Sequence, residues 1–169
     1  MKSIFQMFAG YNAWANARLY AAVAQLPDAE YRADHGAFFK SVHGTLNHLL
    51  VGDRIWMQRL TGEGDAPTRL DAILFEDLES LRAARAAEDA GIVAFVTGLS
   101  EVDLGRRVQY KTISRPAEIE QELGYALPHV FNHQTHHRGQ VHALLTKLTG
   151  DAPSLDLIMY QRETGVGLS

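Results

Sequence analysis

Five of the eight histidines lie in one stretch at residues 127–148, LPHVFNHQTHHRGQVHALLTKL. His133 and His137 are four positions apart. On a helix, side chains with this spacing lie on one face with Cβ atoms about 5–6 Å apart. Two imidazoles so placed can both reach one metal ion at about 2.0–2.1 Å. The spacing therefore predicts a helix that carries two chelating histidines.

The helical phase of this stretch places the same two histidines toward the protein core. At about 100° per residue, one stripe contains the apolar residues Val130, Val141, Leu144 and Leu148. His137 falls near the centre of this stripe and His133 toward its side. His129 and His136 fall at its margin, and His142 points away. We therefore expect His129, His136 and His142 not to bind a metal.

A pair of core histidines satisfied by hydrogen bonds is the alternative interpretation. No Glu follows His133, so the H-E-x-x-H pattern of zinc proteases is absent. The chain has no cysteine, which restricts metal ligands to His, Asp, Glu or water. A third ligand must come from elsewhere, and His43 and His48 are the candidates. His48 lies within an apolar segment, whereas His43 is expected to be more exposed, so the sequence favours His48.

Four long segments have apolar residues at three- and four-residue steps, which predicts helices. The segments are residues 2–25, 41–60, 71–97 and 116–149. The connections between them are unequal in length, notably residues 26–40 and 98–116. The sequence therefore predicts an all-α fold, a four-helix bundle with long connections, in a single domain over residues 1–169.

Several local signals mark the ends of these segments. Ser41 is a candidate N-cap, and Pro116 suits the first turn of the helix that it opens. Pro128 removes one backbone hydrogen bond from the same helix. Residues 107–113 alternate enough to predict a short strand or hairpin arm, and residues 155–163 a short final helix.

Polar residues within or beside the apolar faces are candidates for supporting a metal site. They are Asp53, Asn12, Gln140, His136 and Arg138. Asp53 falls in the middle of an apolar face, where a charge is costly unless it is paired. A buried Arg138–Asp53 pair is an equally good interpretation. The Glu and Arg run from Glu76 to Asp89 is expected to be a solvated face. Gly44 and Gly52 are small enough to let another helix approach.

Charge and hydropathy exclude several classes of function. The net charge is −4 with the two signs interspersed, whereas a nucleic-acid-binding protein needs a basic face. No apolar run approaches membrane-spanning length, and the first residues do not resemble a signal peptide. We expect a cytoplasmic protein that binds neither nucleic acid nor membrane.

Three motifs resemble the DinB family of damage-inducible, metal-dependent proteins. They are YNAWAN at 11–16, TLNHLLVGDRIW at 45–56 and FNHQTHHRGQV at 131–141. The resemblance spans nearly the whole chain. It implies a four-helix bundle that holds a divalent metal ion, such as Zn, Ni or Fe, through His48, His133 and His137. It also implies a homodimer.

Three protein ligands leave positions on a metal open, which is typical of catalytic sites. The wider superfamily that the chain resembles includes thiol-dependent S-transferases and a thiol-dependent maleylpyruvate isomerase. The resemblance therefore implies a metal-dependent enzyme, an S-transferase with a small thiol cosubstrate or a hydrolase. Two alternatives remain: a non-catalytic, metal-stabilised stress-response module, and a helical bundle whose histidines are structural. If neutral imidazoles bind the metal, its affinity should fall as the pH drops through about 6.5.

Overall fold

Four amphipathic segments form the long helices of the computed structural model, which describes residues 1–113 and 117–168. The helices are α1 (Lys2–Val23), α3 (Val42–Thr61), α4 (Leu78–Gly98) and α5 (Leu123–Thr149). They form a four-helix bundle in which α1 contacts α4 and α5, and α3 contacts α4 and α5. The all-α bundle predicted from the sequence is confirmed.

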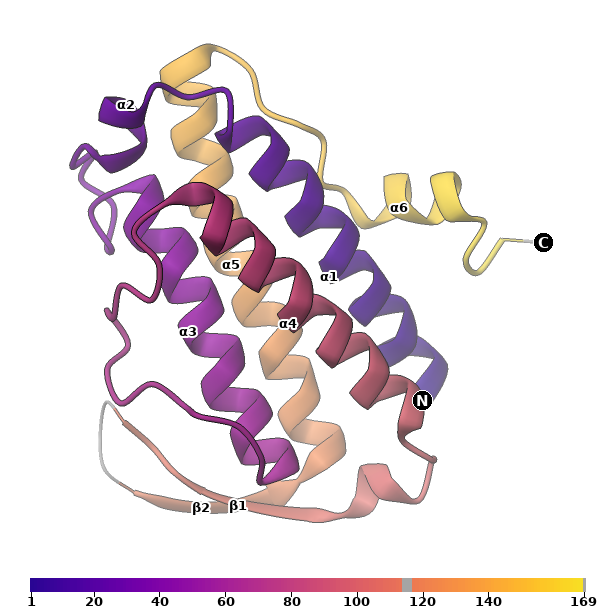
Figure 1. Ribbon diagram of the computed structural model, residues 1–169. Helices are drawn as coiled ribbons and strands as arrows, with labels where there is room; N and C mark the ends of the chain where they lie inside the picture. Colours follow the sequence, from indigo (N-terminus) through magenta and orange to yellow (C-terminus); the bar gives the residue numbers. More distant parts are fainter. Residues whose placement is uncertain (114–116, 169) are drawn as a thin grey trace.

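The bundle is not a series of simple hairpins. Figure 1 shows α1 and α5 running toward one end of the molecule, and α3 and α4 toward the other. The segment 62–77 between α3 and α4 returns along the length of the bundle, so these two successive helices run in the same direction. The expectation of long connections is therefore confirmed, and the segment 62–77 runs beside α3 along the side of the bundle.

Shorter elements close the two ends of the bundle. Helix α2 (Asp28–Arg32) precedes α3, and α6 (Leu157–Thr164) packs against α1. Strands β1 (Arg107–Lys111) and β2 (Glu118–Glu122) form an antiparallel hairpin after the short 3-10 turn Asp103–Gly105. Figure 1 shows this hairpin crossing the end of the bundle where α3 stops and α5 starts. The predicted strand near 107–113 is therefore confirmed as the first arm of a hairpin.

The predicted helix at 71–97 starts too early, because α4 begins only at Leu78. Two interactions hold the preceding residues in an extended path. The side-chain oxygen of Asn47 accepts hydrogen bonds from the backbone N–H groups of Leu74 and Phe75, at 2.8 and 3.0 Å. The Asp77 side chain then accepts from the Ser80 N–H, which caps the helix.

The predicted helix at 116–149 is also too long at its start. Pro116 lies outside the described residues, and residues 118–122 form β2, so α5 begins at Leu123. Pairing with β1 decides this conformation. Glu120 accepts hydrogen bonds from the side chains of Arg107 and Gln109 on the neighbouring strand. The Ser41 prediction is confirmed, since its hydroxyl accepts a hydrogen bond from the Gly44 N–H at 2.9 Å.

A charged network is buried where the four long helices meet. Asp53 of α3 lies 2.8 Å from the Arg85 guanidinium, which lies 2.9 Å from Asp89. Arg85 and Asp89 are 2 % and 5 % exposed, so the prediction of a solvated face for Glu76 to Asp89 is wrong at these two residues. Burial raises the pKa of Asp53 to about 6 although Arg85 and Gln134 oppose the rise, which leaves the carboxylate ionised at neutral pH.

Arg138 of α5 enters the same network but does not pair with Asp53. Its guanidinium donates hydrogen bonds to the side-chain oxygens of Asn12 and Asn16, both on α1. Gln134 connects it to the carboxylate, accepting from Arg138 at 3.3 Å and donating to Asp53 at 2.6 Å. The partner of Asp53 is therefore Arg85, which the sequence did not single out.

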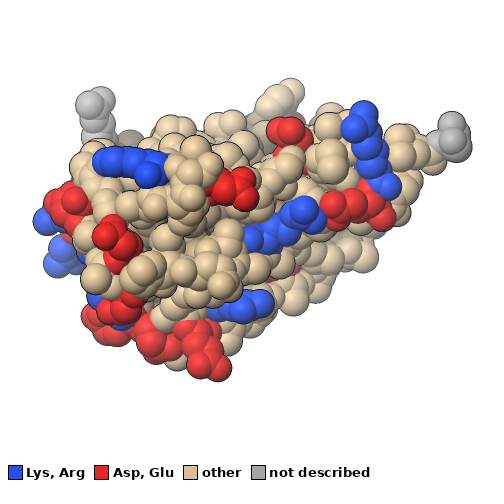
Figure 2. Space-filling model, turned by 90° about the horizontal axis from the view of Figure 1, so that it is seen from above, with Lys and Arg blue, Asp and Glu red and all other residues tan. Residues whose placement is uncertain are grey.

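The surface carries both charge signs. Figure 2 shows Lys and Arg interspersed with Asp and Glu over the face seen from above, with no continuous basic area there. Among the described residues, no helix combines the length and apolar character needed to cross a membrane.

Candidate metal centre

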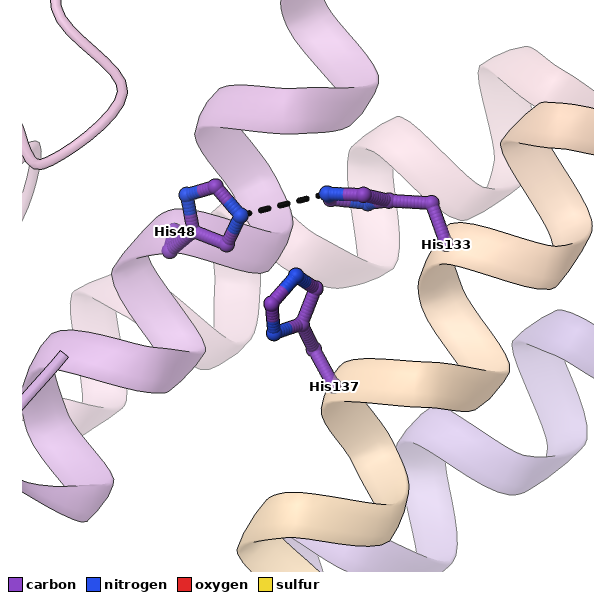
Figure 3. A group of neighbouring side chains, drawn as sticks. All are labelled: His48, His133 and His137. Carbon is purple, nitrogen blue, oxygen red and sulfur yellow. Dashed lines mark hydrogen bonds between the residues drawn. The ribbon is translucent and has the colours of Figure 1, made fainter. Parts of the chain in front are cut away.

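Three histidines from two helices converge on one point inside the bundle. Figure 3 shows His48 of α3 pointing toward His133 and His137, which lie one turn apart on α5. The Nε2 atoms of His48 and His133 are 3.1 Å apart, and one nitrogen from each of the three rings lies within 4.8 Å of the others. The structure thus brings together the three residues that the motifs pointed to.

Hydrogen bonds fix which nitrogen of two rings faces the centre. Nδ1 of His48 lies 2.7 Å from the Leu70 carbonyl oxygen, which can only accept, so Nδ1 carries the proton and Nε2 keeps its lone pair. Nδ1 of His137 lies 2.8 Å from the Gln140 side-chain oxygen and is protonated for the same reason. Both rings therefore present an unprotonated Nε2, the form in which imidazole binds a metal.

His133 completes the cluster in a space that a glycine provides. A Cβ added at Gly52 would lie 2.7 Å from Cε1 of His133, so only glycine lets this ring lie against α3. Its Nδ1 is buried and has no hydrogen-bond partner among the described residues. A buried ring nitrogen without a partner is energetically costly. Hydrogen bonds to residues outside the cluster orient the rings of His48 and His137, but none among the described residues orients the ring of His133.

The loop before α3 supplies a wall that the sequence did not predict. Phe39 stacks on His48 with ring centroids 3.7 Å apart, and contacts His137 edge-to-face. A Cβ at Gly44 would lie 2.2 Å from the Phe39 carbonyl oxygen, so this glycine admits the loop rather than another helix. Gly52, by contrast, does admit a helix, because it faces α5. No periodicity in residues 30–40 marks Phe39 as a site residue.

Burial keeps the three rings neutral. It lowers the pKa of His48 to about 4, against the opposing effect of the Leu70 carbonyl. It lowers the pKa of His133 to about 3, and the neighbouring imidazoles, His137 first, lower it further. Burial also lowers the pKa of His137, although Gln140 opposes this. The three imidazoles are therefore neutral at pH 7, so none of them has to release a proton before it binds a metal ion.

The remaining histidines near these helices lie outside the cluster. His129 and His136 are exposed, as their positions at the margin of the stripe predicted. His142 bonds the Pro153 carbonyl at 3.1 Å, on the side away from the cluster. His43 is 7 % exposed, which contradicts the expectation that it is exposed, and its Nε2 bonds the Phe75 carbonyl at 3.0 Å. His43 therefore holds the loop before α4 in place and is not part of the histidine cluster.

The five supporting candidates separate into two groups. Gln140 bonds His137 directly, and its amide nitrogen lies 3.3 Å from Nε2 of His136, so both lie at the site. Asn12, Asp53 and Arg138 belong to the buried charged network described above. The network is linked to the site through α5, where Gln134 and Arg138 directly follow His133 and His137. It is also linked through α3, where Gln134 donates a hydrogen bond to the carbonyl of Leu49, the residue after His48.

A cavity of about 550 Å³ opens beside the three histidines. One end is the histidine cluster with Phe39 and Leu70, and the other is formed by Trp56 and Tyr110. The Tyr110 side chain comes from β1, so the hairpin at the end of the bundle forms part of the cavity wall. Small molecules can therefore reach the histidines from solvent.

The donor set fits a divalent metal ion. Nitrogens bound at about 2.0–2.1 Å to one tetrahedral ion lie about 3.3 Å apart, close to the 3.1 Å between His48 and His133. The three donors are neutral, two have their orientation fixed by hydrogen bonds, and the third has an unpaired buried nitrogen. Three imidazoles would leave at least one position of such an ion free for a further ligand, and the cavity lies beside the cluster.

Comparison with known proteins agrees with the motifs. The DinB family model matches residues 1–165. The chain is also similar to the protein DinB of Bacillus subtilis (strain 168), with 28% identity over 144 residues, which covers 80% of each chain.

Proposed function

Because the chain belongs to the DinB family, we propose that it binds one divalent metal ion through His48, His133 and His137 and is a metal-dependent enzyme that uses a small thiol. The observation that carries the proposal is the convergence of three neutral imidazoles at the end of an open cavity. Closed structural zinc sites normally have four protein ligands, most often including Cys, which this chain lacks.

A divalent ion bound by three imidazoles lowers the pKa of a thiol or water at its open position and so supplies a nucleophile at neutral pH. The residues of the chain orient the ligands, limit the access of water and position the substrate. Leu70 and Gln140 hold the rings of His48 and His137 in the ligating tautomer. Phe39 covers one side of His48 and limits the access of water there. The cavity positions the electrophile beside the thiol.

Thiol transfer is preferred to hydrolysis because of the walls of the cavity. The described lining contains no carboxylate of the kind that acts as general base in H-E-x-x-H zinc proteases, and the only bases it offers besides the three ligands are His129 and His136. A thiol bound as thiolate needs no such base once its proton is lost to solvent. Zinc, nickel and iron all suit imidazole ligands, so the supply in the cell decides among them.

The test combines elemental analysis of the purified protein with a screen for thiol transfer. We expect one divalent ion per chain, and turnover that requires both the ion and a small thiol. Bound metal without exchange of thiols at the ion would favour a non-catalytic, metal-stabilised module. Protein that takes up no metal even when it is supplied would make the histidines structural and overturn the proposal.

A further inference from the structure

Among the described residues, one cationic side chain without an acidic partner lines the cavity beside the histidines. Among its described lining residues, Arg59 is the only Lys, Arg, Asp or Glu. The guanidinium lies over the rings of Trp56 and Tyr110, at 4.8 and 4.7 Å from their centroids. Its Nη2 donates a hydrogen bond to the Lys111 carbonyl at 2.9 Å. This arrangement fixes the plane of the guanidinium and leaves most of its N–H groups without a partner among the described residues.

An arginine so placed normally has a carboxylate partner. Among residues 1–113 and 117–168, no Asp or Glu oxygen lies within 4.0 Å of a guanidinium nitrogen of Arg59. Arg54, on the same helix, shows the usual arrangement, because its Nε lies 3.6 Å from Glu88. Partial burial lowers the pKa of the Arg59 guanidinium, and Tyr110 opposes this, in keeping with a cation that has no carboxylate partner among the described residues.

The positive charge reaches the neighbourhood of the histidines. His129 contacts Trp56, with centroids 4.7 Å apart, and lies next to His133 at 5.8 Å. Arg59 and His129 both contact the ring of Trp56, and the charge of Arg59 adds to burial in lowering the pKa of His129. Arg59 follows Gly52, which faces His133, by seven residues, or about 10 Å along the helix.

We propose that Arg59 is the carboxylate-binding residue of this cavity, and that the ligand is an organic anion with a metal-binding group at one end and a carboxylate at the other. The planar guanidinium matches a carboxylate in a two-bond, bidentate geometry. Between these two ends the ligand is uncharged, and this portion packs against the apolar cavity wall formed by Trp56, Tyr110 and Ile55. The inference rests on the proposed function, because the thiol of the ligand occupies the open position of the metal.

The experiment uses cobalt-loaded full-length protein and two matched thiols, 6-mercaptohexanoate and 6-mercaptohexanol, which differ in the carboxylate. Binding is read from the change in cobalt absorption when sulfur joins the metal. We expect the unsubstituted protein to bind the carboxylate probe at least about tenfold more tightly, the usual size of a hydrogen-bonded charge pair. Arg59→Gln should remove this preference without changing affinity for the alcohol, and Arg59→Lys should keep part of it.

Arg54→Gln is the matched control, since it removes an arginine from the same helix but outside this cavity, and it should keep the full preference. Cobalt stoichiometry and thermal unfolding of each variant establish that it is folded. The role of Arg59 is overturned if the unsubstituted protein binds the two thiols equally, or if Arg59→Gln still prefers the carboxylate. Either result leaves the proposed thiol function standing. If neither thiol changes the cobalt spectrum, the proposed thiol function fails, and the inference fails with it.

Discussion

The Nε2 atoms of His48 and His133 lie 3.1 Å apart although the residues are 85 positions apart in the sequence. The Leu70 carbonyl accepts the Nδ1 proton of His48, so the Nε2 of His48 faces His133 with its lone pair. At this distance either the Nε2 of His133 donates its proton to the Nε2 of His48, or an ion lies between the two nitrogens. His137 adds a third lone pair at the same point, which one proton cannot satisfy.

The first prediction concerns the ligands. His48→Ala, His133→Ala and His137→Ala should each abolish binding of a stoichiometric divalent ion, because two remaining imidazoles chelate poorly. Metal content after equilibrium dialysis is the measurement. His142→Ala is the control and should bind normally, since His142 contacts Pro153 instead. If His137→Ala keeps its metal while His136→Ala loses it, the assignment of facing residues on α5 is wrong.

The second prediction concerns the glycine opposite His133. Gly52→Ala should weaken metal binding at least about tenfold, because the new Cβ would displace a ligand ring, and misplaced ligand support typically costs 10–100-fold in affinity. Gly91→Ala is the control: the site of its Cβ is open, and alanine should stabilise α4 by about 0.5–1 kcal/mol. Calorimetric titration and thermal unfolding measure both effects. Unchanged metal affinity in Gly52→Ala would contradict the observed packing of His133.

The third prediction concerns the pH dependence of metal binding. Because burial lowers the pKa of His48 to about 4 and of His133 to about 3, protons do not compete for these nitrogens near pH 6.5. Burial lowers the pKa of the third ligand, His137, as well, so metal affinity should decline at a lower pH than the value of about 6.5 that ordinary histidines predict. Titration of the metal at a series of pH values checks this. A steep loss of affinity centred at about 6.5 would contradict it.

The fourth prediction concerns the stability of the metal-free protein. The lowered pKa values of His48 and His133 determine whether the free energy of unfolding rises or falls with pH. Below about pH 6.5 the unfolded chain protonates His48 and His133, while the folded state excludes these protons until about pH 4 and 3 respectively. The unfolded state then binds more protons, so stability should decrease as the pH falls from about 6.5 to about 4. Urea unfolding of the metal-free protein across this range provides the measurement, and His48→Phe should reduce the slope.

The fifth prediction concerns the buried ion pair. Asp53→Asn should destabilise the protein by about 1–3 kcal/mol, because the buried Arg85 loses one of its two carboxylate partners but keeps Asp89. Glu118→Gln removes an exposed pair with Lys111 and should cost less than about 1 kcal/mol. The free energies of unfolding in urea give the comparison. Equal effects of the two substitutions would show that the buried network contributes no more than a surface contact.

The homodimer implied by the family resemblance stays a prediction. Sedimentation at micromolar protein concentration measures it directly, and a monomer across that range would reject it.

The sequence alone determined the features that depend on neighbours within a few residues. The four-residue spacing of His133 and His137, and their phase relative to Val141 and Leu144, follow from the helical repeat, so the facing pair was predictable. The cap at Ser41 and the strand at 107–111 depend on similarly local chemistry. The absence of cysteine fixed the class of ligand.

The tertiary structure decided what depends on contacts between distant segments. Residues 118–122 are a strand because β1 lies beside them, and Arg85 is buried because Asp53 on another helix offsets its charge. Phe39 and the Leu70 carbonyl reach His48 from loops whose paths no periodicity encodes. A helical repeat determines which side chains share a face. It does not determine which other segment covers that face, because that depends on how all the helices and connections pack together.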